Sequence, residues 1–142
     1  MHNWFETTVK YEKTAEEGKI VKVSEKHLVD ALSFTEAEAR IIKEMKPFIS
    51  GEFTVAGIVP KKYNELFYNE NGYKWFKAKV NFITLDEEKG REKKTATYML
   101  IQANDLKEAR EGLVEGMKGT QADYELEGLT ETKIVDVFKY EA

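Results

Sequence analysis

An internal repeat is the feature that most constrains how this 142-residue chain can fold. Trp4 aligns with Trp75, a shift of 75 − 4 = 71, and the shift becomes 90 − 18 = 72 where Lys89 is an extra residue. After the predicted helix it returns to 128 − 57 = 71. The pairs that carry the repeat include Gly18/Gly90, Leu28/Leu100, Met45/Met117, Gly57/Gly128 and Phe67/Phe138. Because turn glycines and helix starts agree as well as apolar positions, a repeated unit is favoured over chance similarity between two amphipathic segments.

Each copy predicts a β-hairpin followed by a helix. Apolar and polar residues alternate from Trp4 and from Trp75, and a charged turn ending in Gly18 or Gly90 leads into a second alternating segment. The helix starts are signalled by a cap residue with a glutamate three positions later. These pairs are Ser33 with Glu36 and Asp105 with Glu108, and Pro47 and Gly119 mark the two helix ends.

An extended segment closes each copy, over 52–67 and over 123–140, with Gly57 and Gly128 suggesting a bulge or a break in it. Asn71-Gly72 between aromatic segments is typical of a tight hairpin. We therefore predict an α+β fold: a tandem duplication of a ββαβ unit, residues 1–70 and 71–142. The two repeats are expected to form one compact domain, a pseudo-symmetric antiparallel sheet with two helices on one face.

Composition and motifs argue against catalysis. The chain has no cysteine and two histidines, His2 and His27, so a thiol nucleophile or a histidine-based triad or metal cluster cannot be assembled. His27 aligns with Met99 and is expected to pack in the core. Glycine-rich phosphate loops and nucleophile elbows are missing from the sequence. We expect no enzyme activity, no cofactor, no metal and no membrane segment, and a cytoplasmic protein.

The sheet face opposite the helices is the candidate binding surface. Aromatic residues and lysines alternate there: Trp4, Trp75, Tyr98, Lys22, Lys26, Lys77, Lys79 and Lys94. Rings that stack on bases, with cations along the phosphates, are typical of single-stranded DNA or RNA platforms. The net charge of −4 argues mildly against a purely electrostatic nucleic-acid binder. The same residues would also suit a buried interface within the chain, with a protein partner, or in a homo-oligomer.

Two glycines inside the second predicted helix, Gly112 and Gly116, are unusual because each costs about 1 kcal/mol relative to alanine. They indicate either close packing of another element against this helix or a marginal, exposed helix.

The run from Leu28 to Arg40, together with Asn3-Trp4-Phe5 and Gly51-Glu52-Phe53, resembles an uncharacterised family. It is one of the domains of unknown function of Bacteroides-type bacteria and their phages. The resemblance implies no activity, cofactor or functional residues.

Overall fold

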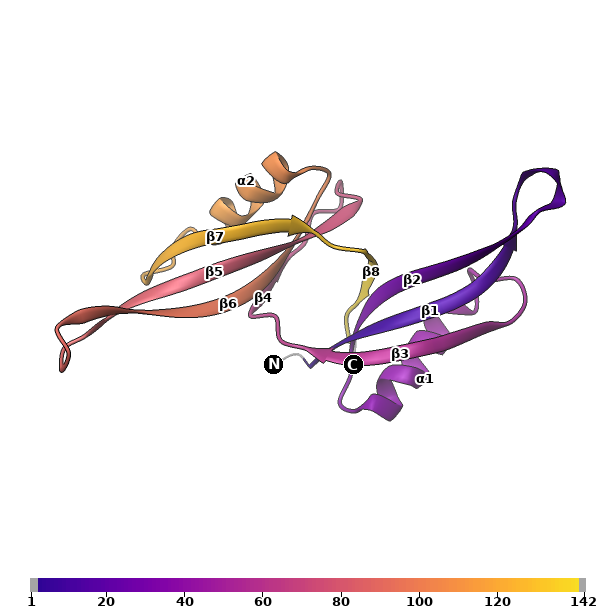
Figure 1. Ribbon diagram of the computed structural model, residues 1–142, viewed down its shortest axis with the longest axis horizontal. Helices are drawn as coiled ribbons and strands as arrows, with labels where there is room; N and C mark the ends of the chain where they lie inside the picture. Colours follow the sequence, from indigo (N-terminus) through magenta and orange to yellow (C-terminus); the bar gives the residue numbers. More distant parts are fainter. Residues whose placement is uncertain (1–2, 141–142) are drawn as a thin grey trace. The chain divides into compact units, whose positions relative to one another are not determined.

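The computed structural model describes residues 3–140 (Figure 1). The chain divides after Lys62 and again after Thr132 into two compact units. Unit 2 is Tyr63–Thr132, and unit 1 takes the chain on both sides of it. The boundaries of these units differ from those of the two predicted repeats, 1–70 and 71–142. Instead of one shared antiparallel sheet, each unit has a four-stranded sheet of its own.

Unit 1 is a twisted sheet with one helix packed on a face of it. The strand order is β3-β1-β2-β8, with β8 parallel to β2 and the other pairs antiparallel. The helix α1 packs against β1, β2 and β3. The elements are β1 (Trp4–Thr14), a 3-10 turn (Glu16–Gly18), β2 (Ile20–Asp30), α1 (Phe34–Met45), β3 (Phe53–Lys61) and β8 (Ile134–Phe138).

Unit 2 has the same strand topology as unit 1, with β7, β5, β6 and β4 at the positions of β3, β1, β2 and β8. Its strand order is β7-β5-β6-β4, with β4 parallel to β6, and α2 packs against β6, β7 and β4. The elements are β4 (Glu65–Phe67), β5 (Lys74–Asp86), β6 (Arg91–Ala103), α2 (Leu106–Gly116) and β7 (Asp123–Glu131). The predicted α+β class is confirmed, and both sheets are mixed because each contains one parallel pair.

Period-two alternation builds one core beneath each helix. In unit 1, alternate residues of β1 and β2 meet the apolar stripe of α1: Phe5, Val9 and Val29 with Ala37, Ile41 and Met45. In unit 2 the equivalent set is Phe76, Val80, Met99 and Ile101 with Ala109 and Leu113. Both sets were readable in the sequence because strand and helix periods fix which residues share a face.

The predicted helix caps are confirmed. The side chain of Ser33 accepts the backbone N–H of Glu36 at 3.1 Å, and that of Asp105 accepts the N–H of Glu108 at 2.8 Å. Each bond satisfies one of the backbone donors that a helix leaves unpaired at its first turn.

The predicted bulges are also confirmed. The pairing of β1 with β3 shifts register between Thr8 and Val9, beside Gly57, and the pairing of β5 with β7 shifts between Lys79 and Val80, beside Gly128. An extra residue on the outer strand of each pair increases the local twist of the sheet there.

The segments predicted as one extended element per copy are each two strands, and the second strand joins the other unit. β4 follows β3 in the chain but pairs with β6 in unit 2, while β8 follows β7 but pairs with β2 in unit 1. The two units therefore exchange their last strands, and this exchange is why the unit boundaries fall near residues 62 and 132.

The tight hairpin predicted at Asn71-Gly72 does not form, because β4 and β5 are not neighbours in the sheet. Gly72 has a different role. A Cβ added there would lie 2.7 Å from the backbone nitrogen of Ala103, so only glycine allows the loop to approach β6 this closely.

The surroundings of Gly116 distinguish between close packing and an exposed, marginal helix, the two explanations for the glycines of α2. A Cβ added to it would overlap the ring of Phe67, which β4 brings onto α2. Close packing is therefore the reason for glycine at this position.

Candidate binding surface

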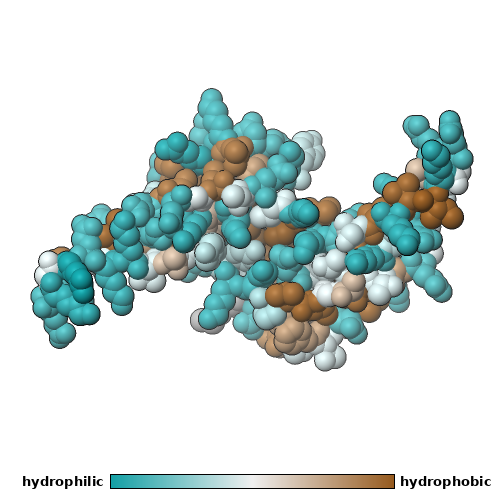
Figure 2. Space-filling model, in the orientation of Figure 1, coloured by the Kyte–Doolittle hydropathy of each residue, from teal (hydrophilic) through white to brown (hydrophobic). Residues whose placement is uncertain are grey.

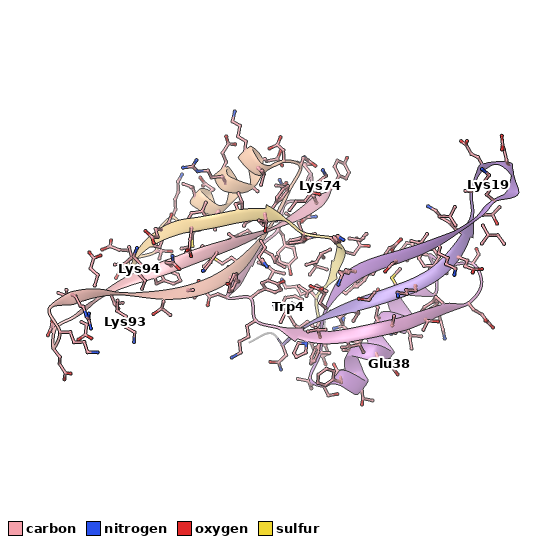
Figure 3. All side chains as sticks on the ribbon, viewed as in Figure 1. Trp4, Lys19, Glu38, Lys74, Lys93 and Lys94 are labelled. Atoms are coloured by element: carbon pink, nitrogen blue, oxygen red, sulfur yellow. The ribbon has the colours of Figure 1, made fainter. Side chains whose placement is uncertain are left out.

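The face of each sheet opposite its helix contains the predicted site residues. The strand register places Trp4, Lys22 and Lys26 on this face in unit 1. In unit 2 it places Trp75, Lys77 and Lys79 of β5 there with Tyr98 and Lys94 of β6. The predicted grouping by face is thus found within each unit separately (Figure 3 labels Trp4 and Lys94).

The two tryptophans are buried. Trp4 and Trp75 are each only 3% exposed, and Leu28 and Leu100 on the same faces are fully buried. The ring of Trp75 meets that of Tyr68 edge-on, with 5.5 Å between centroids. A ring that stacks on a nucleobase must expose one of its faces. Neither tryptophan does so here, and burial within the protein is the alternative that the sequence left open.

Two of the lysines of unit 2 are paired with glutamates of β7. Lys79 Nζ lies 2.8 Å from Glu127 and Lys94 Nζ lies 2.9 Å from Glu125. The amide of Asn81 donates to both carboxylates, at 3.1 and 3.2 Å. The hydrogen bonds to the lysines, followed by those to Asn81, lower the pKa of Glu125 and Glu127. The same carboxylates raise the pKa of Lys79 and Lys94.

Sequence reasoning missed these glutamates. Their signal was the alternation of Asp123, Glu125 and Glu127, which places acidic side chains at the edge of the lysine face. The sequence pattern indicated that the lysines of β5 and β6 share a face, but it did not indicate that β7 pairs with β5 beside them.

The remaining predicted residues also have neighbours. Lys77 lies over the ring of Tyr98, 5.5 Å from its centroid, and this ring is 39% exposed. Lys26 pairs with Glu6 at 3.1 Å, and Lys22 stands opposite Glu12 in the register. Both faces therefore carry mixed charge, which gives a polyanion less attraction than an unpaired lysine row would.

The outer edges of the two long hairpins are a feature that the sequence analysis did not consider. β8 pairs with β2 only from Lys26 onward, so Ile20–Glu25 has β1 on one side and no strand on the other among the described residues. Likewise β4 pairs with β6 only from Met99 onward, which leaves the outer edge of the stretch before Tyr98 open. An open edge presents unpaired N–H and C=O groups to another chain.

Backbone alternation shows which residues of β2 present these groups. The N–H of Ala31 donates to Asn3 beside β1, so odd-numbered residues of the hairpin strand direct their backbone groups toward β1. Even-numbered residues direct theirs outward. The outward set on the open edge of β2 is Ile20, Lys22 and Ser24.

The two open edges differ in side chains. On β2 the edge carries Ile20, which is 68% exposed, together with Val21 and Val23. On β6 it carries four successive charged residues, 91–94. Figure 2 shows hydrophobic residues at the projecting hairpin of unit 1, whereas the hairpin of unit 2 is mostly hydrophilic.

A groove crosses the sheet of unit 1 from β2 over β1 to the start of β3. It has a volume of 810 Å³, and its walls come from β1, β2 and the loop that leads into β3. Its lining includes Tyr11, Lys22, Val23, Ser24, Gly51 and Phe53. The groove therefore lies across the paired strands and adds nothing to the free backbone groups of the open edge.

Comparison with known proteins assigns the family. A model of a domain of unknown function, DUF4494, matches residues 3–140. The chain belongs to the DUF4494 family. No curated protein and no solved structure matches the chain. Within residues 3–140, no group of three metal-ligating side chains is gathered. Neither helix of that same part is long and apolar enough to cross a bilayer.

Proposed function

We propose that this DUF4494 chain is a non-catalytic assembly module that self-associates through the open edge of β2. The observation that carries the proposal is the stretch Ile20–Glu25, an unpaired strand edge rich in β-branched residues. Such an edge is a template for pairing with another chain unless charge, proline or a bulge protects it. We also propose that the protein is cytoplasmic and that it comes from Bacteroides-type bacteria or their phages.

The other long edges are protected by such features. β6 carries the charged run 91–94, and β3 has Pro60 and a bulge. β7 has a bulge and acidic residues at alternate positions. The open edge of β2, Ile20–Glu25, has two charged residues, Lys22 and Glu25, and Glu25 directs its backbone groups toward β1. This contrast supports β2 as the edge that accepts a partner.

A second copy of the chain fits this edge around a two-fold axis at Val23. Antiparallel pairing then places Val23 opposite Val23 of the second copy and Lys22 opposite Ser24 of the second copy. Both outward-facing residues, Lys22 and Ser24, would form hydrogen-bonded pairs, which gives about four backbone hydrogen bonds. A two-fold axis at Lys22 would oppose two lysines and is disfavoured. In this register only 21–25, five residues a side, face the open edge of the other copy, because Ile20 would face Lys26, which pairs with β8. Five residues a side make a small interface, so the association is expected to be weak.

The test is the mass of the protein by light scattering and sedimentation from low micromolar to near-millimolar concentration. The unmodified chain should shift from monomer to dimer. Ser24→Pro, which removes one outward N–H, should keep it monomeric. The matched control is Ala96→Pro, at the equivalent position of β6 (24 + 72 = 96), and it should still dimerise.

A chain that stays monomeric throughout, or Ser24→Pro and Ala96→Pro variants that dimerise equally, would refute assembly through β2. Titration of labelled single-stranded DNA and RNA should show no binding. Binding that weakens with salt would move the function to nucleic acid instead.

A further inference from the structure

The loop that joins the two repeats contains the only Asn-Gly pair of the sequence, Asn71-Gly72. This junction, residues 68–73, links β4 to β5. Asn71 is exposed, whereas Gly72 is buried. Asparagine followed by glycine is the pair most prone to deamidation, because glycine has no Cβ to keep its nitrogen away from the neighbouring side chain. The junction therefore carries a pair with a reaction of its own.

Deamidation of this pair needs no reagent other than water. The backbone nitrogen of Gly72 forms a bond to Cγ of Asn71, the Cγ–Nδ2 bond breaks, and Nδ2 leaves as ammonia with the proton of the Gly72 N–H. Water then opens the resulting succinimide ring at either carbonyl. One opening gives aspartate. The other gives isoaspartate, in which the backbone runs through the side-chain carboxyl group and is longer by a methylene.

In the docked junction the reacting nitrogen is protected. The N–H of Gly72 donates to the carbonyl of Asn69 at 2.8 Å, and Gly72 is buried against the backbone of Ala103. The N–H of Asn71 donates to Oδ1 of Asn69 at 3.1 Å. Attack requires the Gly72 nitrogen to give up its proton, and a carbonyl holds this proton in a buried position. The reaction is therefore blocked as long as the junction stays docked.

Side chains of β6 and α2 hold the junction in this state. Gln102 Oε1 accepts the N–H of Asn69 at 2.9 Å, and Gln102 Nε2 donates to the carbonyl of Gly72 at 3.1 Å. Nδ2 of Asn69 donates to Glu108 of α2 at 3.1 Å. The junction is thus tied both to a strand and to a helix of unit 2.

Asn104, between β6 and α2, supplies two more hydrogen bonds. Its Oδ1 accepts the N–H of Tyr73, and its Nδ2 donates to the carbonyl of Asn71, both at 3.0 Å. The equivalent residue of unit 1 is Leu32, since 32 + 72 = 104, and it is 79% exposed. A leucine side chain cannot make such bonds, so Leu32 is a matched position without this role.

Release of β4 would open the junction. This strand has three residues, Glu65–Phe67, and they pair with Met99–Ile101 of β6. The junction begins at the next residue, so the strand and the junction leave unit 2 together. Elements with few contacts open with a smaller free-energy cost than the core of a protein does. Opening of β4 is therefore the step that frees the nitrogen of Gly72.

We propose that Asn71 is a deamidation site that reacts only while β4 and the junction are released from unit 2. The isoaspartate product keeps them released, because the longer backbone displaces Gly72 from a position where even an added Cβ would lie 2.7 Å from the nitrogen of Ala103. The modification thus converts a reversible opening into a permanent one. The proposal does not rest on assembly through β2, because every residue in it belongs to unit 2.

Peptide mass spectrometry on the full chain, incubated at mildly alkaline pH, tests the site. Deamidation at Asn71 is followed with time in the native protein and in guanidinium, and isoaspartate is assayed by enzymatic methylation. The native rate should be at least about tenfold below the rate in guanidinium, because the reactive state is a minor, opened state.

Two variants and a matched control connect the rate to docking. Asn104→Ala removes two hydrogen bonds to the junction and should raise the native rate at Asn71 by about tenfold. Leu32→Ala, the control, should leave it unchanged. Gly116→Ala, whose Cβ would overlap Phe67 of β4, should also raise the rate. This second variant tests the release of β4 even if Asn104→Ala unfolds.

Hydrogen exchange of the aged protein tests the consequence of the modification. The peptide over Glu65–Phe67 should lose protection in molecules that contain isoaspartate, whereas β8 should keep its protection. Equal rates in the native protein and in guanidinium, a native rate unchanged in both Asn104→Ala and Gly116→Ala, or full protection of β4 in the isoaspartate form would overturn the proposal.

Discussion

The contact between Gly116 and Phe67 gives the sharpest test of the strand exchange. In an ordinary exposed helix, Gly→Ala stabilises by about 1 kcal/mol. Here the added Cβ would overlap the Phe67 ring, because β4 lays this ring on the α2 backbone. Gly116→Ala should therefore push Phe67 away from the core of unit 2, against which it packs.

The magnitude follows from these two opposing terms. Exposing a fully buried phenylalanine side chain costs about 1.5–3 kcal/mol, and the lower end applies to Phe67 because it is only partly buried. The helix gains at most about 1 kcal/mol, because Gly116 is the last residue of α2. The net effect of Gly116→Ala is a destabilisation of unit 2 by roughly 0.5–1 kcal/mol. In a Phe67→Ala background the ring is gone, so the same substitution should instead stabilise by about 1 kcal/mol. The sign of the effect is expected to reverse between the two backgrounds.

Guanidinium unfolding followed by tryptophan fluorescence measures this cycle. Trp75 lies in unit 2 and Trp4 in unit 1, so a Trp4→Phe background makes the signal report unit 2 alone. The interaction energy is the difference between the two Gly116→Ala effects. If Gly116→Ala stabilises the protein by the same amount in both backgrounds, the two substitutions are additive. Phe67 is then not on α2, and the described pairing of β4 with β6 is wrong.

Two further predictions concern the helix caps and the glutamates of β7. Ser33→Ala and Asp105→Ala should each destabilise their own unit by about 1 kcal/mol, measured by the same unfolding assay with the tryptophan of that unit. The lowered pKa values of Glu125 and Glu127 mean that their contribution to stability is present above the ordinary glutamate value of 4.5 and is lost as the pH falls through the folded-state value. Carbon-13 NMR titration of the carboxyl groups should show both midpoints below 4.5, and Lys94→Gln should raise that of Glu125.

Local features of the fold were predictable from the sequence because local chemistry sets them. Ser33 and Asp105 cap helices through bonds that span three residues. The bulges beside Gly57 and Gly128 follow from a missing side chain in an alternating strand. The partners of β4 and β8 were not predictable in this way. Strand pairing is non-local, and a three-residue strand such as β4 has too short a pattern to select its neighbour.

The sequence predicted which residues of the candidate site share a face, but not whether they are buried or paired with other charges. Alternation correctly placed Trp4 and Trp75 on the face opposite the helices. It could not show whether that face is covered, and both rings are buried. The paired carboxylates Glu125 and Glu127 also come from another strand, so the charge of the lysine face depends on pairing that the lysine pattern does not contain.

The exchanged strands pair in the same register in the two units. Val137 of β8 pairs with Leu28, and Leu66 of β4 pairs with Leu100. The repeat relates these pairs directly, since 66 + 71 = 137 and 28 + 72 = 100. Topology and register are thus the same in both units, so any difference in how firmly β4 and β8 are held must arise from the side chains that differ.

β8 also lies where the open edge of β2 ends. It covers β2 from Lys26 to Val29, directly beyond the open stretch Ile20–Glu25. Release of β8 would lengthen the edge available to a second copy, and a longer edge forms more backbone hydrogen bonds.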